Sequence, residues 1–343
     1  MFFKSDNGSG AAPEIMAAIQ RANDGYATSY GADALMDRVR ARIRTLFDAP
    51  KAAVYLVATG TAANALALAI HTQPWTAVLC HEASHLALDE CGAPEFYTGG
   101  AKLLSVPGPH GKMTPETLTQ TLGLISQGDV HSVQRGTLSL TNVTEAGTVY
   151  TTGEIAGLSA IARSNGMRCH LDGARFANAL VATGATAAGM TWQVGIDVVS
   201  FGGTKNGCLG VEAVVIFDPA KAWEFELRRK RAGHLVSKHR YLSAQMDAYL
   251  TDELWLRLAA TANHMGRRLA AGLAAIPGIY LLHPVDANIL FPEWNSGTHD
   301  RAEAKGAVYN RFPAAPNRES ARLVTSWRTT EAEVDTLLAA LRP

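Results

Sequence analysis

Short runs of β-branched and apolar residues alternate with stretches of helical pattern between residues 52 and 218. Such alternation is typical of a mainly parallel sheet with helices on both of its faces. We therefore predict an α/β fold built on one large sheet. The runs that we expect to form strands are 52–57, 77–80, 102–106, 136–143, 167–172, 197–203 and 211–218.

The pattern changes after about residue 219. A long helical stretch with few breakers extends to about residue 275, short strands follow, and an amphipathic helix is expected near the end of the chain. These features predict a smaller α+β domain, joined to the first by a long helix. We expect the later strands at 279–283, 287–291 and 321–327, the last helix at 330–342, an N-terminal segment at 1–20, the large domain at 21–235 and the small domain at 236–343.

Composition narrows the classes of partner. The 343 residues carry 31 Lys and Arg against 31 Asp and Glu, so the net charge is zero. This balance argues against nucleic acid or an anionic membrane as the main partner, because both select an excess of positive charge. Apolar residues make up 47% and charged residues 18%, which allows a large core and further burial by self-association. The four cysteines are scattered without metal-binding spacing, which predicts no metal site. No signal-like or membrane-spanning run occurs, and together with the unpaired spacing of the cysteines this predicts a cytoplasmic protein.

Two strand ends carry the strongest chemical signal. The motif HLDGAR at 170–175 places Asp172 at the carboxyl end of one apolar strand, and SFGGTKNG at 200–207 places Lys205 after the next. Ligands of open α/β sheets bind outside these ends. A lysine amine can form a Schiff base with a carbonyl cofactor, and an aspartate can keep a pyridine nitrogen protonated. Together they predict a pyridoxal phosphate site.

A cofactor phosphate requires several N–H donors. The run ATGTA at 58–62 follows a strand and opens a helix, so Gly60 and Thr61 lie where a helix N-terminus offers free N–H groups. Thr204 adds a hydroxyl just before the lysine. A Gly-Thr pair before a helix is also an ordinary cap, so the interpretation depends on its combination with Lys205 and Asp172.

A series of further motifs spreads over nearly the whole chain: Ser5-Asp6, SYGAD at 29–33, TGTAAN at 59–64, EASH at 82–85, DVH at 129–131, LDGARFANA at 171–179, SFGGTKNG at 200–207 and RLVTSW at 322–327. These motifs resemble those of the low-specificity L-threonine aldolases, which are β-eliminating lyases of pyridoxal-phosphate fold type I. TEAGTVY and TKNG are most similar to the branch that includes phenylserine aldolases. The resemblance implies an aminotransferase-like fold with a mainly parallel seven-stranded sheet. It also implies cleavage of threonine, allo-threonine or phenylserine-type amino acids to glycine and an aldehyde, in a homotetramer with shared active sites.

The resemblance assigns roles to individual residues. Lys205 would carry the cofactor as a Schiff base, Asp172 would pair with the ring nitrogen, and His85 would stack on the ring. His85, His131 and a bound water are all left open as the base that takes the β-hydroxyl proton. The other implied residues are Gly60, Thr61 and Thr204 for the phosphate, Arg175 for the cofactor and the substrate carboxylate, Arg322 for that carboxylate, and Ser5 and Tyr30 for the substrate, with Tyr30 often coming from a neighbouring subunit.

Some segments depart from the family pattern or permit two interpretations. Ala62 stands where many relatives have Gln or Met, and TNVTEAGTVY at 141–150 replaces an Asn-Thr-His-Asn loop near the substrate. Glu145 in this segment contacts a β-hydroxyl or faces solvent. The basic run 228–231 is a solvated helix face or approaches a phosphate in a neighbouring subunit.

Other functions fit the same scaffold. An aminotransferase shares the lysine, the aspartate and a carboxylate-binding arginine, and racemisation or β-elimination are further options. A non-catalytic regulator with a DNA-binding module is disfavoured, because the net charge is zero and no helix-turn-helix segment precedes Ser5.

Overall fold

The computed structural model describes residues 1–342. Its large sheet has seven strands in the order β1-β7-β6-β5-β4-β2-β3. Only β7 runs against its neighbours β1 and β6, and the other pairs are parallel. The predicted mainly parallel seven-stranded sheet is confirmed. The strands are β1 (Ala53–Val57), β2 (Thr76–His81), β3 (Lys102–Val106), β4 (Gln134–Thr141), β5 (Arg168–Gly173), β6 (Val198–Gly202) and β7 (Glu212–Ile216).

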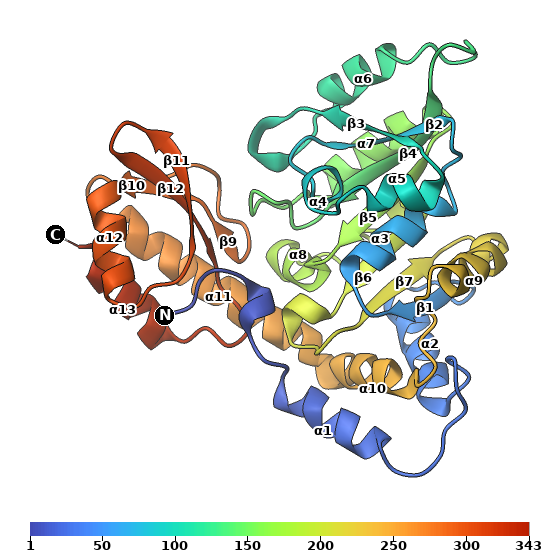
Figure 1. Cartoon of the computed structure of the whole chain (residues 1–343), viewed down its shortest axis with the longest axis horizontal. Helices are drawn as coiled ribbons and strands as arrows, with labels where there is room; N and C mark the ends of the chain where they lie inside the picture. The colour runs from blue at the N-terminus through green and yellow to red at the C-terminus, as the bar shows by residue number, and fades with distance from the viewer. Residues whose placement is uncertain (343) are drawn as a thin grey trace.

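Helices cover both faces of this sheet (Figure 1). All residues of β1, β2, β6 and β7 are buried, which explains their nearly continuous apolar sequences. The Ala- and Leu-rich helix α3 is buried from Ala62 to Ala69. The helices are α1 (Pro13–Ala22), α2 (Ala34–Leu46), α3 (Gly60–Ala69), α4 (His85–Leu88), α5 (Ala93–Thr98), α6 (Pro115–Gly123), α7 (Thr152–Ser164), α8 (Phe176–Thr183), α9 (Ala222–Arg231), α10 (Arg240–Tyr249), α11 (Leu254–Ala274), α12 (Ser296–Ala304) and α13 (Glu331–Leu341).

The helical stretch expected after residue 219 is divided into α9, α10 and α11. Gly233 with φ of 78° follows α9, and Asp252 and Glu253, with φ of 50° and 54°, separate α10 from α11. Residues other than glycine rarely adopt left-handed backbone angles. The expectation of one long helical stretch was therefore wrong. The second break was not visible in the sequence, because Asp252 and Glu253 do not usually end helices.

A second sheet has the order β11-β12-β10-β8, with β9 paired to β12. It confirms strands near 280, 289 and 321, and adds two that were not predicted, β10 and β11. Helices α12 and α13 lie beside it (Figure 1). The strands are β8 (Tyr280–Leu281), β9 (Ile289–Leu290), β10 (Pro292–Asn295), β11 (Asn310–Ala315) and β12 (Arg318–Val324).

Two main cores divide the chain at a different point from the expected 235/236 boundary. The core of the large sheet extends through α10 to Ala259 in α11. The core of the small sheet begins at Met265 in the same helix and also includes Phe3. Helix α11 therefore belongs to both domains, and the N-terminal segment is shared in the same way. Among residues 1–342, no helix is long and apolar enough to cross a membrane.

Candidate active site

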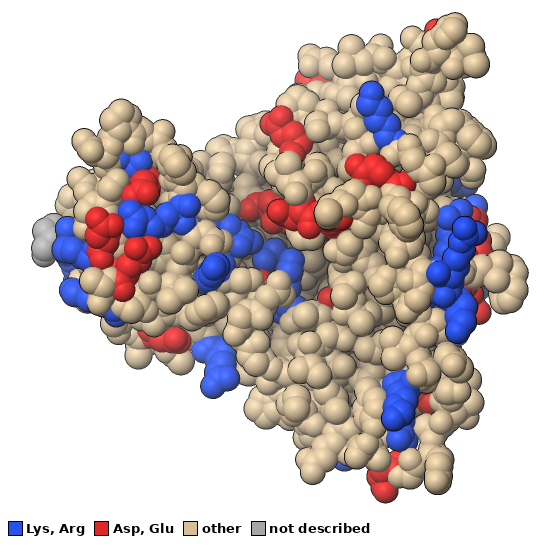
Figure 2. Space-filling model, viewed as in Figure 1, with Lys and Arg blue, Asp and Glu red and all other residues tan. Residues whose placement is uncertain are grey.

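A cavity of about 240 Å³ lies at the carboxyl ends of β5 and β6, beside the N-terminus of α3. Acidic and basic atoms meet in the hollow between the two lobes of the molecule (Figure 2). Six of the predicted residues line the cavity: Gly60, Thr61, His85, Asp172, Thr204 and Lys205.

Asp172 is held rigidly at the end of β5. Its side chain is buried at 2% exposure, and Oδ1 accepts a hydrogen bond from Ala174 N at 3.0 Å. Oδ2 accepts one from Asn64 Nδ2 at 3.0 Å. A buried carboxylate with both oxygens oriented in this way is suited to pair with a cationic ring nitrogen.

Lys205 lies in a short 3₁₀ turn, η4 (Thr204–Asn206), directly after β6. The end of β6 that precedes this turn packs closely on the residue after β5: a Cβ on Gly202 would lie 2.4 Å from the carbonyl oxygen of Ala174, so this position requires glycine. Asn206 Nδ2 fixes the turn by donating to Tyr249 Oη at 2.7 Å. The backbone that carries Lys205 is therefore fixed beside Asp172.

The N-terminus of α3 provides an anion-binding position. Thr59 is the N-cap, and its side chain accepts a hydrogen bond from Ala62 N at 3.2 Å. The N–H groups of Gly60 and Thr61 belong to the first turn, where helices lack internal acceptors. Because an amine, a buried carboxylate and this helix end surround one cavity, the residues fit pyridoxal phosphate.

Arg175 forms a buried ion pair that was not predicted. Its Nε and Nη2 atoms donate to Asp6 Oδ2 and Oδ1 at 2.6 and 2.9 Å, and both side chains are at most 3% exposed. Burial by itself would raise the pKa of Asp6, but the Arg175 guanidinium lowers it overall. Asp6 thus occupies two donors of Arg175, and a contact of Arg175 with substrate stays a prediction.

Arg322 has a different environment. Its side chain is half-buried, and within residues 1–342 it makes neither a hydrogen bond nor an ion pair. Burial and the nearby Arg175 lower its pKa, against the opposing effect of Glu145, Asp6 and Asp89. An incoming carboxylate would supply the missing negative charge and match the planar guanidinium.

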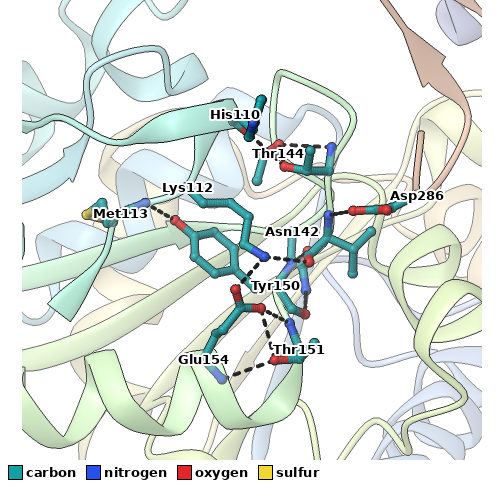
Figure 3. A network of polar contacts seen from close by, with 11 residues as sticks. His110, Lys112, Met113, Asn142, Thr144, Tyr150, Thr151, Glu154 and Asp286 are labelled. Atoms are coloured by element: carbon teal, nitrogen blue, oxygen red, sulfur yellow. Dashed lines mark hydrogen bonds and ion pairs between the residues drawn. The ribbon is translucent and has the colours of Figure 1, made fainter. Parts of the chain in front are cut away.

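Glu145 is presented to the cavity by the loop between β4 and α7, which a network of polar contacts holds in place (Figure 3). Asn142 and Tyr150 exchange two hydrogen bonds of 3.1 Å across this loop. Asp286 of the small domain accepts from Val149 N at 2.9 Å. The loop is therefore fixed from both domains, and Glu145 faces the cavity rather than open solvent.

Two buried carboxylates in the cavity wall had not been predicted. Glu90 Oε1 lies 2.8 Å from His85 Nδ1, within hydrogen-bond distance, and accepts from Asn64 Nδ2 at 2.9 Å. Glu212 accepts from Gly203 N at 2.7 Å, and burial raises the pKa of Glu212 to about 7. A charged residue that opens the apolar strand β7 is a visible signal for Glu212, whereas nothing in the local sequence distinguishes Glu90.

Comparisons with known proteins agree with this geometry. The family model described as "Beta-eliminating lyase" matches residues 3–295. The chain belongs to the β-eliminating lyase family. This confirms the predicted family and fold.

Several known proteins are similar to this chain. The low specificity L-threonine aldolase of Pseudomonas sp. is 41% identical over 340 residues, which cover 99% of this chain and 96% of that protein. The solved structure of Leishmania major threonine aldolase has a TM-score of 0.93 at 29% identity, with 99% and 98% of the two chains covered. An alanine racemase of Cochliobolus carbonum is 34% identical over 180 residues, 52% of this chain and 44% of that protein.

His131 is not in the cavity of this β-eliminating lyase. It lies in an exposed turn that precedes β4, whereas the carboxyl end of β4 faces the cavity. The eight residues of β4 separate the two edges of the sheet by roughly 25 Å. His131 therefore does not reach the cavity of its own chain, and its role in a site shared between subunits stays a prediction.

Ser5 and Tyr30 also lie outside the cavity of their own chain. The Ser5 hydroxyl accepts from Asn7 N at 3.2 Å and caps the turn η1 (Asp6–Gly8), and Asn7 is the residue that lines the cavity. Tyr30 is 50% exposed, and Lys230 Nζ of the basic run lies 5.1 Å from its ring centroid. The substrate roles of Ser5 and Tyr30 stay predictions.

The basic run 228–231 is not uniformly solvated. Arg229 is 5% exposed and donates to Leu56 O at 3.2 Å, while Arg228 pairs with Glu224. At least part of the run therefore has a structural role.

Proposed function

We propose that this chain is a pyridoxal-phosphate-dependent aldehyde-lyase. It cleaves L-threonine, L-allo-threonine or L-phenylserine-type β-hydroxy-α-amino acids to glycine and an aldehyde. The observation that supports this most strongly is the placement of Lys205 and Asp172 on adjacent strand ends beside the α3 N-terminus. The similarity to threonine aldolases over 99% of the chain favours this reaction over racemisation, for which the named relative covers only 52%.

The protein would hold the cofactor at three points. Lys205 anchors it covalently, Asp172 keeps its ring nitrogen protonated, and the N–H groups of Gly60 and Thr61 bind its phosphate. The bound cofactor serves as the electron sink for the pair released when the Cα–Cβ bond breaks.

The substrate would be oriented by charge. Arg322 binds the substrate carboxylate through the two-pronged geometry of its guanidinium. The negative charge of this carboxylate also compensates the positive charge of Arg322. His85, at the cavity wall, accepts the proton of the β-hydroxyl group as the aldehyde forms. Glu145 faces the same cavity and contributes to the choice of substrate side chain.

We also propose a homotetramer with shared sites in a cytoplasmic setting. Tyr30 is exposed and therefore available to the active site of a neighbouring subunit. This is the role that the resemblance to threonine aldolases suggests for it. Cys80, Cys91, Cys169 and Cys208 are all free thiols, which is usual in reducing compartments.

Reconstitution tests the cofactor and its anchor. Addition of pyridoxal phosphate to the purified protein should produce a visible absorption band that Lys205→Ala lacks. Lys238→Ala, at an exposed lysine, is the matched control and should keep the band. Aldehyde release from L-threonine, L-allo-threonine and L-phenylserine then ranks the substrates. A wild-type protein without the band, or with a band equally strong in Lys205→Ala, would contradict the proposal.

A further inference from the structure

A continuous hydrogen-bonded chain connects His85 to Asp172. His85 Nδ1 lies 2.8 Å from Glu90 Oε1, and the Glu90 side chain is fully buried at 0% exposure. Asn64 Nδ2 lies 2.9 Å from the same Oε1 and 3.0 Å from Asp172 Oδ2. All four residues line the cavity, so His85 and Asp172 are joined along its wall through Glu90 and Asn64.

The chemistry of these groups determines where the protons lie. Both neighbours of the Asn64 amide are carboxylate oxygens, which only accept, so Asn64 presents its NH₂ group to both. Glu90 Oε1 therefore accepts from Asn64, and when Glu90 is ionised the hydrogen bond to His85 requires that Nδ1 donate. Burial raises the pKa of Glu90, whereas the hydrogen bonds with His85 and Asn64 favour its ionised form. In the neutral imidazole the other nitrogen, Nε2, then carries no proton.

We propose that Glu90 is a positioning residue that keeps the proton of neutral His85 on Nδ1, so that Nε2 is the atom that accepts the β-hydroxyl proton. This inference rests on the proposed aldolase function. The substrate O–H bond breaks and an N–H bond forms at Nε2. The O–H electron pair forms the aldehyde C=O bond, and the Cα–Cβ pair leaves with the glycine fragment. The imidazolium that results faces the Glu90 carboxylate, an arrangement that orients and stabilises a catalytic histidine.

The backbone and the local charges agree with this role. Directly after Glu90 the chain turns through Cys91 and Gly92, both left-handed at φ of 51° and 74°, and the Glu90 side chain is buried. The hydrogen bond that His85 donates to Glu90 raises the pKa of His85, while burial and Lys205 lower it and the charges of Glu90 and Asp172 raise it. The net direction is upward, so His85 is readily protonated when it acts as a base.

Deuterium exchange at the histidine C2–H position, followed by mass spectrometry on the cofactor-free protein, measures the pKa of His85 directly. In Glu90→Gln this pKa should fall below that of the wild type, because the charged acceptor is lost. Glu82→Gln removes the same charge from an exposed position three residues before His85 and should leave the pKa unchanged. An unchanged His85 pKa in Glu90→Gln would overturn the proposal.

The pH profile of the loaded enzyme supplies a second readout. Because His85 acts when neutral, kcat/KM rises with pH through its pKa, and in Glu90→Gln this rise should move to lower pH. A profile that drops in height without moving would indicate a merely structural role. If no aldolase activity is found, the pKa measurement still tests the Glu90 contact, so the two failures are distinguishable.

Nitrogen NMR of the histidine-labelled wild type requires no variant of Glu90 and keeps the test open if Glu90→Gln does not fold. The neutral form of His85, assigned by its loss in His85→Asn, should carry its proton on Nδ1. A proton on Nε2 would refute the proposal.

Discussion

At the scale of single residues, Glu212 makes the folded state sensitive to pH. Burial raises its pKa from 4.5 to about 7, so the folded protein retains a proton that the unfolded chain releases in this window. Stability therefore falls as pH rises from 4.5 through 7. Glu212→Gln does not titrate, and it should gain up to about 3 kcal/mol over the wild type across this range. Urea unfolding of both cofactor-free proteins at pH 5 and pH 8 checks this, and equal pH dependence would contradict it.

Arg322 should affect substrate binding more than turnover. Lysine keeps the charge but loses the planar fork, so Arg322→Lys should lower kcat/KM by roughly 10- to 100-fold, mainly through KM. Steady-state kinetics with L-threonine measure this, with the exposed Arg328→Lys as control. An unchanged KM in Arg322→Lys would show that the carboxylate binds elsewhere.

The cofactor residues could be predicted from the sequence because each follows a predicted strand. The alternation of strands and helices already implies that these strands run in one direction, so their ends lie at the same edge of the sheet. Lys205, Asp172 and Thr61 meet for this reason. Motif order could not show which edge of the sheet carries His131. Glu90 was missed because its contact with His85 depends on a left-handed turn at a non-glycine residue.

At the scale of elements, the loop that presents Glu145 depends on Gly147. This residue has φ of 84°, and a Cβ there would lie 2.3 Å from Ile289 O in β9. Gly147→Ala should destabilise the fold by about 1–3 kcal/mol and also displace Glu145, which lowers activity. Gly166, with φ of 73° and no atom within 4 Å of an added Cβ, is the matched control.

Thermal unfolding and aldehyde release measure both effects. Gly166→Ala should be destabilised only by the strain of an alanine at positive φ, and it should keep its activity. A similar loss in both variants, with activity retained, would show that the close approach to Ile289 is not important.

Most elements of the large sheet were predictable, since buried parallel strands have continuous apolar runs between helical patterns. The strands β10 and β11 were not, because four of the six residues of β11 are exposed and its sequence lacks that pattern. The break between α10 and α11 was missed because Asp252 and Glu253 are not typical helix terminators.

At the scale of the whole molecule, the N-terminal segment joins the two domains. Phe3 is fully buried in the small-domain core, and three residues later Asp6 pairs with Arg175 of the large domain. Phe3→Ala should cost about 3–5 kcal/mol, whereas Phe2→Ala, at a side chain 46% exposed, should cost far less. Chemical denaturation of the two variants decides this, and equal losses would show that Phe3 does not anchor the segment.

The domain boundary expected at 235/236 stays a prediction, and hydrophobic packing extends across it. The change in pattern near residue 219 marks the end of the large sheet, but α10 and the first half of α11 still pack against that sheet's core. Long-range packing, rather than a change in local composition, determines where the two cores separate.

The central claim is that the chain cleaves the Cα–Cβ bond of a β-hydroxy-α-amino acid. Quantification of all products after incubation of the loaded enzyme with L-threonine and L-allo-threonine tests it most directly. We predict glycine and acetaldehyde in equal amounts, and neither with Lys205→Ala. A keto acid, or the D-enantiomer of the substrate, formed in place of glycine would contradict the account.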